Sequence, residues 1–140
     1  MDVVYQTTML TQGGRGGQVQ SEDGSFKLKL AVPESMGGKG GGATPEQLFA
    51  GAYAACLEHS VRHIARTDKL PLKGSYVEAD LSLYVTDEHR YRMGLTFTVH
   101  MAGGLDQATA DSLLQRAHGI CPYADATKNN LSVSLIAVPD

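Results

Sequence analysis

The segment TPEQLFAGAYAAC, residues 44–56, predicts the beginning of a long helix around which the rest of the chain is arranged. Thr44 can cap this helix, Pro45 suits its first position, and Gln47 completes a capping box with Thr44. Apolar residues then recur at steps of three and four, as in a helix that buries one face. These positions are Leu48, Phe49, Ala52, Tyr53, Ala55, Cys56 and Ile64. We therefore expect a helix over residues 45 to about 67, with Cys56 on its inward side.

Strands are predicted on the N-terminal side of this helix. Segments 3–10 and 18–21 are rich in strand-forming residues, and an Asp23-Gly24 turn leads into an alternating segment at 26–32. The glycine-rich segment 37–42 lacks the Gly-Lys-Ser/Thr ending of a phosphate-binding loop and is interpreted as a flexible connection. Whether the loop at 33–43 closes over a site is left open.

Two long strands at 76–85 and 91–101 are predicted to follow the helix and to pair antiparallel. A second helix at 106 to about 118 and a final strand at 131–138 complete the chain. The order of strands, helix, hairpin, helix and strand indicates an α+β fold in one domain, residues 1–140, with two main helices packed on one face of antiparallel sheet.

Size and charge exclude several classes of protein. A chain of 140 residues needs no disulfide to hold a core, because it buries roughly 68–70% of its unfolded surface. The net charge of −3 and the scattered 12 Lys and Arg argue against a nucleic-acid or anionic-membrane partner. The N-terminus lacks the pattern of a signal peptide, and no apolar run is long enough to span a membrane. We expect a cytoplasmic protein, in which a disulfide is more often catalytic or sensing than structural.

The two cysteines occupy different chemical settings. Cys56 lies among small residues on the predicted helix, where a thiol needs a nearby cation to ionise, whereas Cys121 directly precedes Pro122. Arg15, enclosed by glycines, is the candidate cation: at about 4 Å and an effective dielectric of about 20, such a pair is worth on the order of 4 kcal/mol. Cys56 is therefore the candidate attacking thiol and Cys121 the candidate resolving thiol. The alternative is an inert buried Cys56 with Arg15 as an ordinary residue at the tip of a loop.

Three further residues have both a functional and a structural interpretation. Glu46 can orient Arg15 through a bidentate pair, or it can simply stabilise the positive end of the helix. Phe49 and Tyr53 precede Cys56 on the same helix and can either wall an apolar substrate pocket or belong to the core.

Other kinds of active site are not expected. Cys56, His59 and His63 share a helical face, but Cys56 and His63 are about 10.5 Å apart along the axis and cannot bind one metal ion. No Gly-x-Ser-x-Gly elbow of a serine hydrolase occurs. We expect neither a metal nor an organic cofactor.

Four segments together resemble the organic hydroperoxide resistance proteins of the OsmC/Ohr superfamily. They are GGR at 13–15, TPEQLFA at 44–50, AAC at 54–56 and CPYADAT at 121–127. The resemblance extends over nearly the whole chain, and CPYADAT is more similar to the Ohr branch than to the OsmC branch.

This resemblance implies an OsmC-like fold, an intertwined homodimer with active sites at the subunit interface, and a peroxidase without metal, haem or flavin. By the same resemblance Cys56 attacks the peroxide, Cys121 resolves it as a disulfide, and Arg15 and Glu46 form the activating pair. The implied substrates are organic and fatty-acid hydroperoxides. The implied reductant is dihydrolipoamide or a lipoylated protein.

The chain departs from the family where Glu58-His59 replaces the usual apolar residues. Helical spacing places Glu58 about 200° around the axis from Cys56, so we expect it to face outward. Two alternatives stay open: an OsmC-branch peroxidase of broader substrate range, and a redox-sensing or ligand-binding module without turnover.

Overall fold

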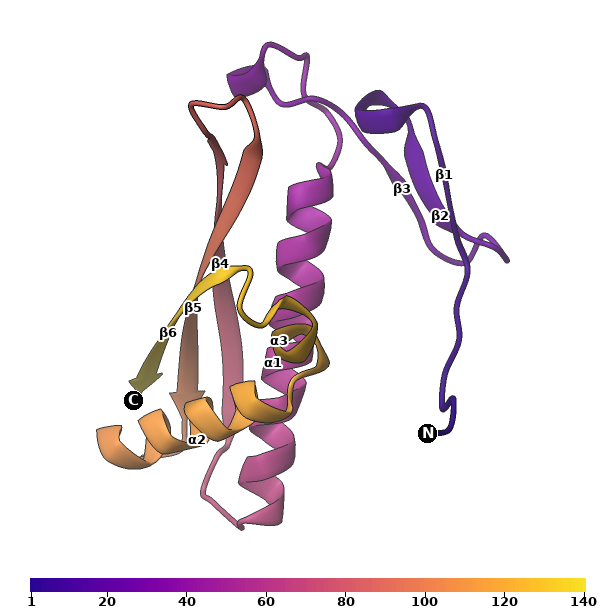
Figure 1. Ribbon diagram of the computed structural model, residues 1–140. Coiled ribbons are helices and arrows are strands. Elements are labelled where there is room, and N and C mark those ends of the chain that lie inside the picture. The colour runs from indigo at the N-terminus through magenta and orange to yellow at the C-terminus, as the bar shows by residue number, and fades with distance from the viewer. The chain divides into compact units, whose positions relative to one another are not determined.

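The computed structural model describes residues 1–140, which divide into two compact units, Met1–Leu48 and Phe49–Asp140. The units are described separately, and Figure 1 shows the elements of each. Helix α1 (Pro45–Thr67) is continuous and crosses the boundary between them. The predicted capping box is confirmed: the Thr44 amide donates to Gln47 Oε1 at 2.9 Å, and the Gln47 amide donates to Thr44 Oγ1 at 3.1 Å.

The first unit contains a small antiparallel sheet of β1 (Met9–Gln12), β2 (Gln18–Ser21) and β3 (Lys27–Lys29). Two short 3-10 turns, η1 (Gly14–Gly16) and η2 (Glu34–Met36), lie in its loops. The predicted turn between β2 and β3 is present, with the Asp23 carboxylate accepting hydrogen bonds from both Ser21 and Ser25.

Two predicted strand boundaries in this unit were wrong. The strand expected at 3–10 begins only at Met9, because its partner β2 ends at Ser21 and the chain turns away there. The strand expected at 26–32 shortens to β3 for the same reason, since β2 offers no further partner; Leu30 instead forms a parallel bridge with Ala43.

The glycine-rich segment after β3 is also more ordered than a flexible connection. The Gly40 amide donates to the Val32 carbonyl at 2.9 Å, and the Ala43 amide donates to the Lys29 carbonyl at 2.9 Å. These bonds fold the segment back along the strand that precedes it.

The second unit contains a sheet in the order β4-β5-β6. Its strands are β4 (Gly74–Val85), β5 (Tyr91–Ala102) and β6 (Ser132–Pro139), and its further helices are α2 (Gln107–Ile120) and α3 (Pro122–Thr127). The predicted antiparallel pairing of β4 with β5 is confirmed, whereas β6 pairs parallel to β5. A parallel pair requires a crossover, and α2 with α3 supplies it.

The helices pack on one face of this sheet and enclose the main core, as predicted for the α+β class. Figure 1 shows α1 running along the strands and α2 crossing them. On β5, Leu95, Phe97, Val99 and Met101 alternate along one face and are all buried. They pack with Leu57 and Val61 of α1 and with buried apolar residues of α2. None of the helices is both long enough and apolar enough to cross a bilayer.

Candidate active site

A tight glycine turn presents Arg15 in the first unit. Gly13 adopts a left-handed conformation with φ of 82°, and a Cβ on Gly17 would lie 1.7 Å from the Gln12 carbonyl oxygen. These positions therefore require glycine, which explains why Arg15 is flanked by them.

Arg15 and Glu46 form a bidentate pair, which was one of two interpretations of Glu46 left open by the residues and the one that the family resemblance implied. Nη1 donates to Oε2 at 2.9 Å and Nη2 donates to Oε1 at 2.5 Å. Glu46 lies in the first turn of α1, and its hydrogen bonds with Arg15 lower the pKa of the carboxyl group despite partial burial. The pair therefore consists of a carboxylate and a guanidinium whose orientation is fixed.

Cys56 and Cys121 are free thiols of the second unit and lie near each other, Cys56 partly exposed and Cys121 buried. Burial raises the pKa of Cys56, and the neighbouring Cys121 thiol raises it further, whereas the Tyr123 backbone lowers it. Within this unit, the surroundings of Cys56 disfavour its thiolate. A reactive Cys56 therefore needs a cation beyond these groups.

Cys121 is held at the junction of two helices. Its amide donates to the His118 carbonyl at 3.3 Å, and its own carbonyl accepts from the Asp125 amide at 3.1 Å. Pro122 occupies the start of α3, a position at which its missing amide hydrogen costs nothing. The Cys-Pro step is therefore a hydrogen-bonded corner between α2 and α3, and α3 was not predicted.

Tyr53 and Phe49 lie on α1 before Cys56. Tyr53 is 0% exposed, and its ring centroid lies 4.7 Å from that of Phe97 and 5.5 Å from that of Tyr123. Phe49 is partly buried and meets the Tyr53 ring edge-on at 6.3 Å. Both residues therefore pack near the thiols, and their contact with a substrate stays a prediction.

His118 is a neighbour of the site that sequence reasoning missed. Its Nε2 lies 2.9 Å from the Tyr53 hydroxyl, and burial lowers the pKa of the imidazole. The signal available in the sequence was its place three residues before Cys121, which puts both side chains near the same end of α2.

Glu58 is engaged away from the thiols. Its Oε1 accepts a hydrogen bond from Ser75 Oγ at 2.8 Å and lies 3.5 Å from Nη1 of Arg62. Its charge is not among the causes that shift the pKa of Cys56. Glu58 is thus half-buried against β4, and does not face outward as expected, although its partners hold it away from the thiols.

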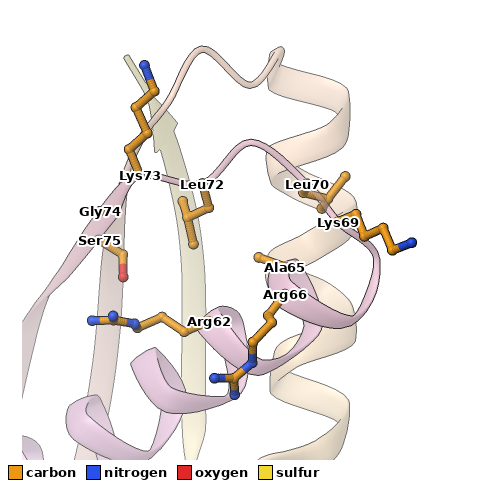
Figure 2. A pocket seen from close by; sticks show the side chains of 9 residues that line it. All are labelled: Arg62, Ala65, Arg66, Lys69, Leu70, Leu72, Lys73, Gly74 and Ser75. Carbon is orange, nitrogen blue, oxygen red and sulfur yellow. The ribbon is translucent and has the colours of Figure 1, made fainter.

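No cluster of three or more His, Cys, Asp or Glu side chains is arranged to hold a metal ion. A pocket of about 380 Å³ lies at the C-terminal end of α1 and is lined by four cationic side chains, Arg62, Arg66, Lys69 and Lys73 (Figure 2). Lys69 and Lys73 extend away from its centre, so the cations do not converge on one point. Neither cysteine lines this pocket.

The α+β fold and the two neighbouring free thiols are features of two-cysteine redox proteins. Residues 38–136 match the family model described as OsmC-like protein. The chain is 38% identical over 135 residues to an organic hydroperoxide resistance protein of Xanthomonas axonopodis pv. citri, covering 95% of this chain and 94% of the relative.

Solved structures of organic hydroperoxide resistance proteins have the same fold as this chain. An organic hydroperoxide resistance protein from Legionella pneumophila superposes with a TM-score of 0.92 at 40% identity, covering 98% of this chain and 99% of the other. OhrB of Bacillus subtilis gives a TM-score of 0.85 at 31% identity, covering 96% and 99%. The chain belongs to the OsmC/Ohr family and is of the Ohr type. It is thus a peroxide-resistance or redox protein.

Proposed function

We propose that this protein is a cysteine-based peroxidase that reduces organic hydroperoxides to alcohols. The observation that carries the proposal is the pair of neighbouring free thiols, Cys56 and Cys121, in a chain whose relatives are named for organic hydroperoxide resistance. Neighbouring thiols can form a disulfide once one of them is oxidised.

The chemistry balances without a cofactor. The Cys56 thiolate attacks one peroxide oxygen, the O–O bond breaks, and the alkoxide leaves and takes a proton to become the alcohol. Cys56 is then a sulfenic acid. Cys121 attacks its sulfur, water leaves, and the disulfide closes.

Arg15, oriented by Glu46, supplies the positive charge that the surroundings of Cys56 lack. Because burial and Cys121 raise the pKa of Cys56, a guanidinium beside it is needed to populate the thiolate at neutral pH. A guanidinium held in a fixed direction by Glu46 can also stabilise charge on the departing oxygen. We assign this role to Arg15.

The substrate and reductant follow from the same proposal. We assign substrate binding to Phe49, which is partly exposed, with the buried Tyr53 packed behind it; aromatic surface near Cys56 favours an organic hydroperoxide over hydrogen peroxide. A dihydrolipoyl dithiol, free or carried on a lipoylated protein, resets the disulfide by exchange, which releases both protein thiols and leaves a cyclic disulfide on the reductant. The working form is an intertwined homodimer.

The test is steady-state consumption of cumene hydroperoxide with dihydrolipoamide, compared with glutathione and with hydrogen peroxide as substrate. We expect turnover with dihydrolipoamide and a clear preference for the organic peroxide. Equal rates on hydrogen peroxide would favour an OsmC-branch peroxidase. Stoichiometric disulfide formation without turnover on any dithiol would instead indicate a redox sensor.

A further inference from the structure

We propose that Tyr53 and His118 form a proton relay that removes the thiol proton of Cys121 when the disulfide closes. The inference rests on the proposed peroxidase and adds a function for two residues that the peroxide-cleaving step does not use. It concerns the second half-reaction, in which the sulfenic acid of Cys56 is resolved.

Four side chains from α1 and the end of α2 are grouped together. Tyr53 and Cys56 are three residues apart on α1, and His118 and Cys121 are three residues apart along the chain at the end of α2, so each pair lies on neighbouring turns. The hydroxyl of Tyr53 lies 2.9 Å from Nε2 of His118. The two thiols are neighbours, since Cys121 raises the pKa of Cys56. One hydrogen bond, between Tyr53 and His118, thus links the two helices near the thiols.

Burial creates the need for a relay. Cys121 is 1% exposed, so bulk water has no direct path to its thiol proton. His118 is only half-buried and therefore connects the inner end of this network with solvent. Burial raises the pKa of the Tyr53 hydroxyl, and negative charge on either sulfur raises it further, so Tyr53 lies near both thiols as well as beside His118.

The groups around the Tyr53–His118 bond favour a neutral imidazole on His118, which can act as a base. Burial lowers the pKa of His118, and no charged side chain contributes to this shift. The neighbouring titratable groups are the thiols of Cys56 on α1 and Cys121 at the α2–α3 junction, and the phenol of Tyr123 on α3. The neighbour from β5 is the uncharged ring of Phe97. A neutral imidazole can accept a proton from the Tyr53 hydroxyl through Nε2 when Nδ1 carries the ring proton.

The step conserves atoms and electrons. Cys121 gives its proton to the Tyr53 oxygen while the Tyr53 proton passes to His118, and the Cys121 sulfur attacks the Cys56 sulfur. The S–S bond forms, the S–O bond breaks, and hydroxide leaves with the electron pair of that bond. Hydroxide gains a proton from solvent and His118 returns one, so the net product is one water. The Cys121 sulfur is oxidised and the Cys56 sulfur is reduced.

The test is single-turnover kinetics of the full-length chain with one equivalent of cumene hydroperoxide from about pH 6 to 9. Sulfenic acid trapped with dimedone and disulfide measured by mass separate the two half-reactions. Tyr53→Phe keeps the ring and removes the hydroxyl. His118→Gln keeps a hydrogen-bonding group but cannot carry a proton. His63→Gln, an exposed histidine on α1, is the matched control.

We expect Tyr53→Phe and His118→Gln to slow disulfide closure roughly tenfold or more near pH 6.5, relative to the rate of sulfenic acid formation measured in the same sample. In His118→Gln the rate of sulfenic acid formation itself should be unchanged. The deficit should shrink as pH rises, because a thiol that has already ionised before the peroxide is added needs no relay. His63→Gln should close at the wild-type rate. Thermal unfolding identifies a variant that fails to fold, and the other variant then carries the test.

Closure of His118→Gln at the wild-type rate would overturn the relay, because a hydrogen bond without proton transfer would then suffice. A deficit that is the same at every pH would overturn it as well. Failure of the wild-type chain to form any sulfenic acid would instead contradict the proposed peroxidase, and the relay with it.

Discussion

The two thiols differ most clearly in exposure. Cys56 is partly exposed on α1, whereas Cys121 is enclosed at the corner between α2 and α3, so a peroxide reaches Cys56 first. We expect Cys56→Ser to abolish peroxide consumption and Cys121→Ser to retain one rapid turnover, ending as an oxidised monothiol. Stopped-flow peroxide loss with mass analysis measures both. Equal loss of the first turnover in the two variants would contradict the assigned order of attack.

Replacement of the cation tests how Cys56 ionises. Burial and Cys121 already raise the pKa of Cys56, so Arg15→Ala should raise it further and reduce the thiolate fraction at pH 7. Because the Arg15 side chain is 44% exposed, solvent screens its charge, and we expect a shift of about one pKa unit or somewhat more, or roughly a tenfold slower alkylation by iodoacetamide.

The pH dependence of the alkylation rate is a further check on the effect of Arg15→Ala. A raised pKa leaves the fully ionised thiolate unchanged, so the wild-type and Arg15→Ala rates should converge as pH rises above both pKa values. Arg116→Ala, which breaks a surface pair with Asp68, is the matched control. An Arg15→Ala rate equal to wild type from about pH 5 to 9 would exclude Arg15 as the cation.

The residues offered the Arg15–Glu46 pair as one of two interpretations, and the family resemblance implied it, whereas His118 was missed. Arg15 among glycines and Glu46 in a first helical turn belong to local patterns, which can be recognised in a sequence. The Tyr53–His118 bond joins residues that are distant in sequence and become neighbours only when α2 packs beside α1. A histidine with no motif of its own gives no sign of that contact.

At the level of elements, α1 has the clearest local signal. The box between Thr44 and Gln47 satisfies two backbone amides at its N-terminus, where Glu46 also lies. Thr44→Ala should reduce the free energy of unfolding by about 0.5–2 kcal/mol, measured by urea denaturation. Thr67→Ala removes an exposed hydroxyl bound to the His63 carbonyl and should change it by less than about 0.5 kcal/mol. Equal losses would show that the box adds nothing specific.

Elements with strong periodicity were predicted well, and those that depend on a partner were not. The helices α1 and α2 and the β4–β5 hairpin follow from patterns within each segment. The N-terminal strand was too long because its length is set by β2, and the direction of β6 depends on the crossover through α3. The short α3 has too few residues to show a period.

At the scale of the whole molecule, the candidate residues divide between the two units. Arg15 and Glu46 belong to Met1–Leu48, whereas Cys56 and Cys121 belong to Phe49–Asp140. Along α1, ten residues separate Glu46 from Cys56, which corresponds to about 15 Å of rise and roughly 80° of rotation. One arginine head held by Glu46 does not comfortably span that separation along a continuous helix.

We therefore predict that Arg15 and Glu46 of one subunit face Cys56 and Cys121 of the other in a homodimer. The measurement is complementation: a Cys56→Ser chain and an Arg15→Ala chain are unfolded together, refolded and assayed with cumene hydroperoxide and dihydrolipoamide. Each heterodimer then contains one site with both defects and one with neither, so activity should return to about half of wild type per heterodimer. The separately refolded variants are the controls. If mass analysis confirms heterodimers and activity stays at the level of the two variants alone, each site is assembled within a single chain.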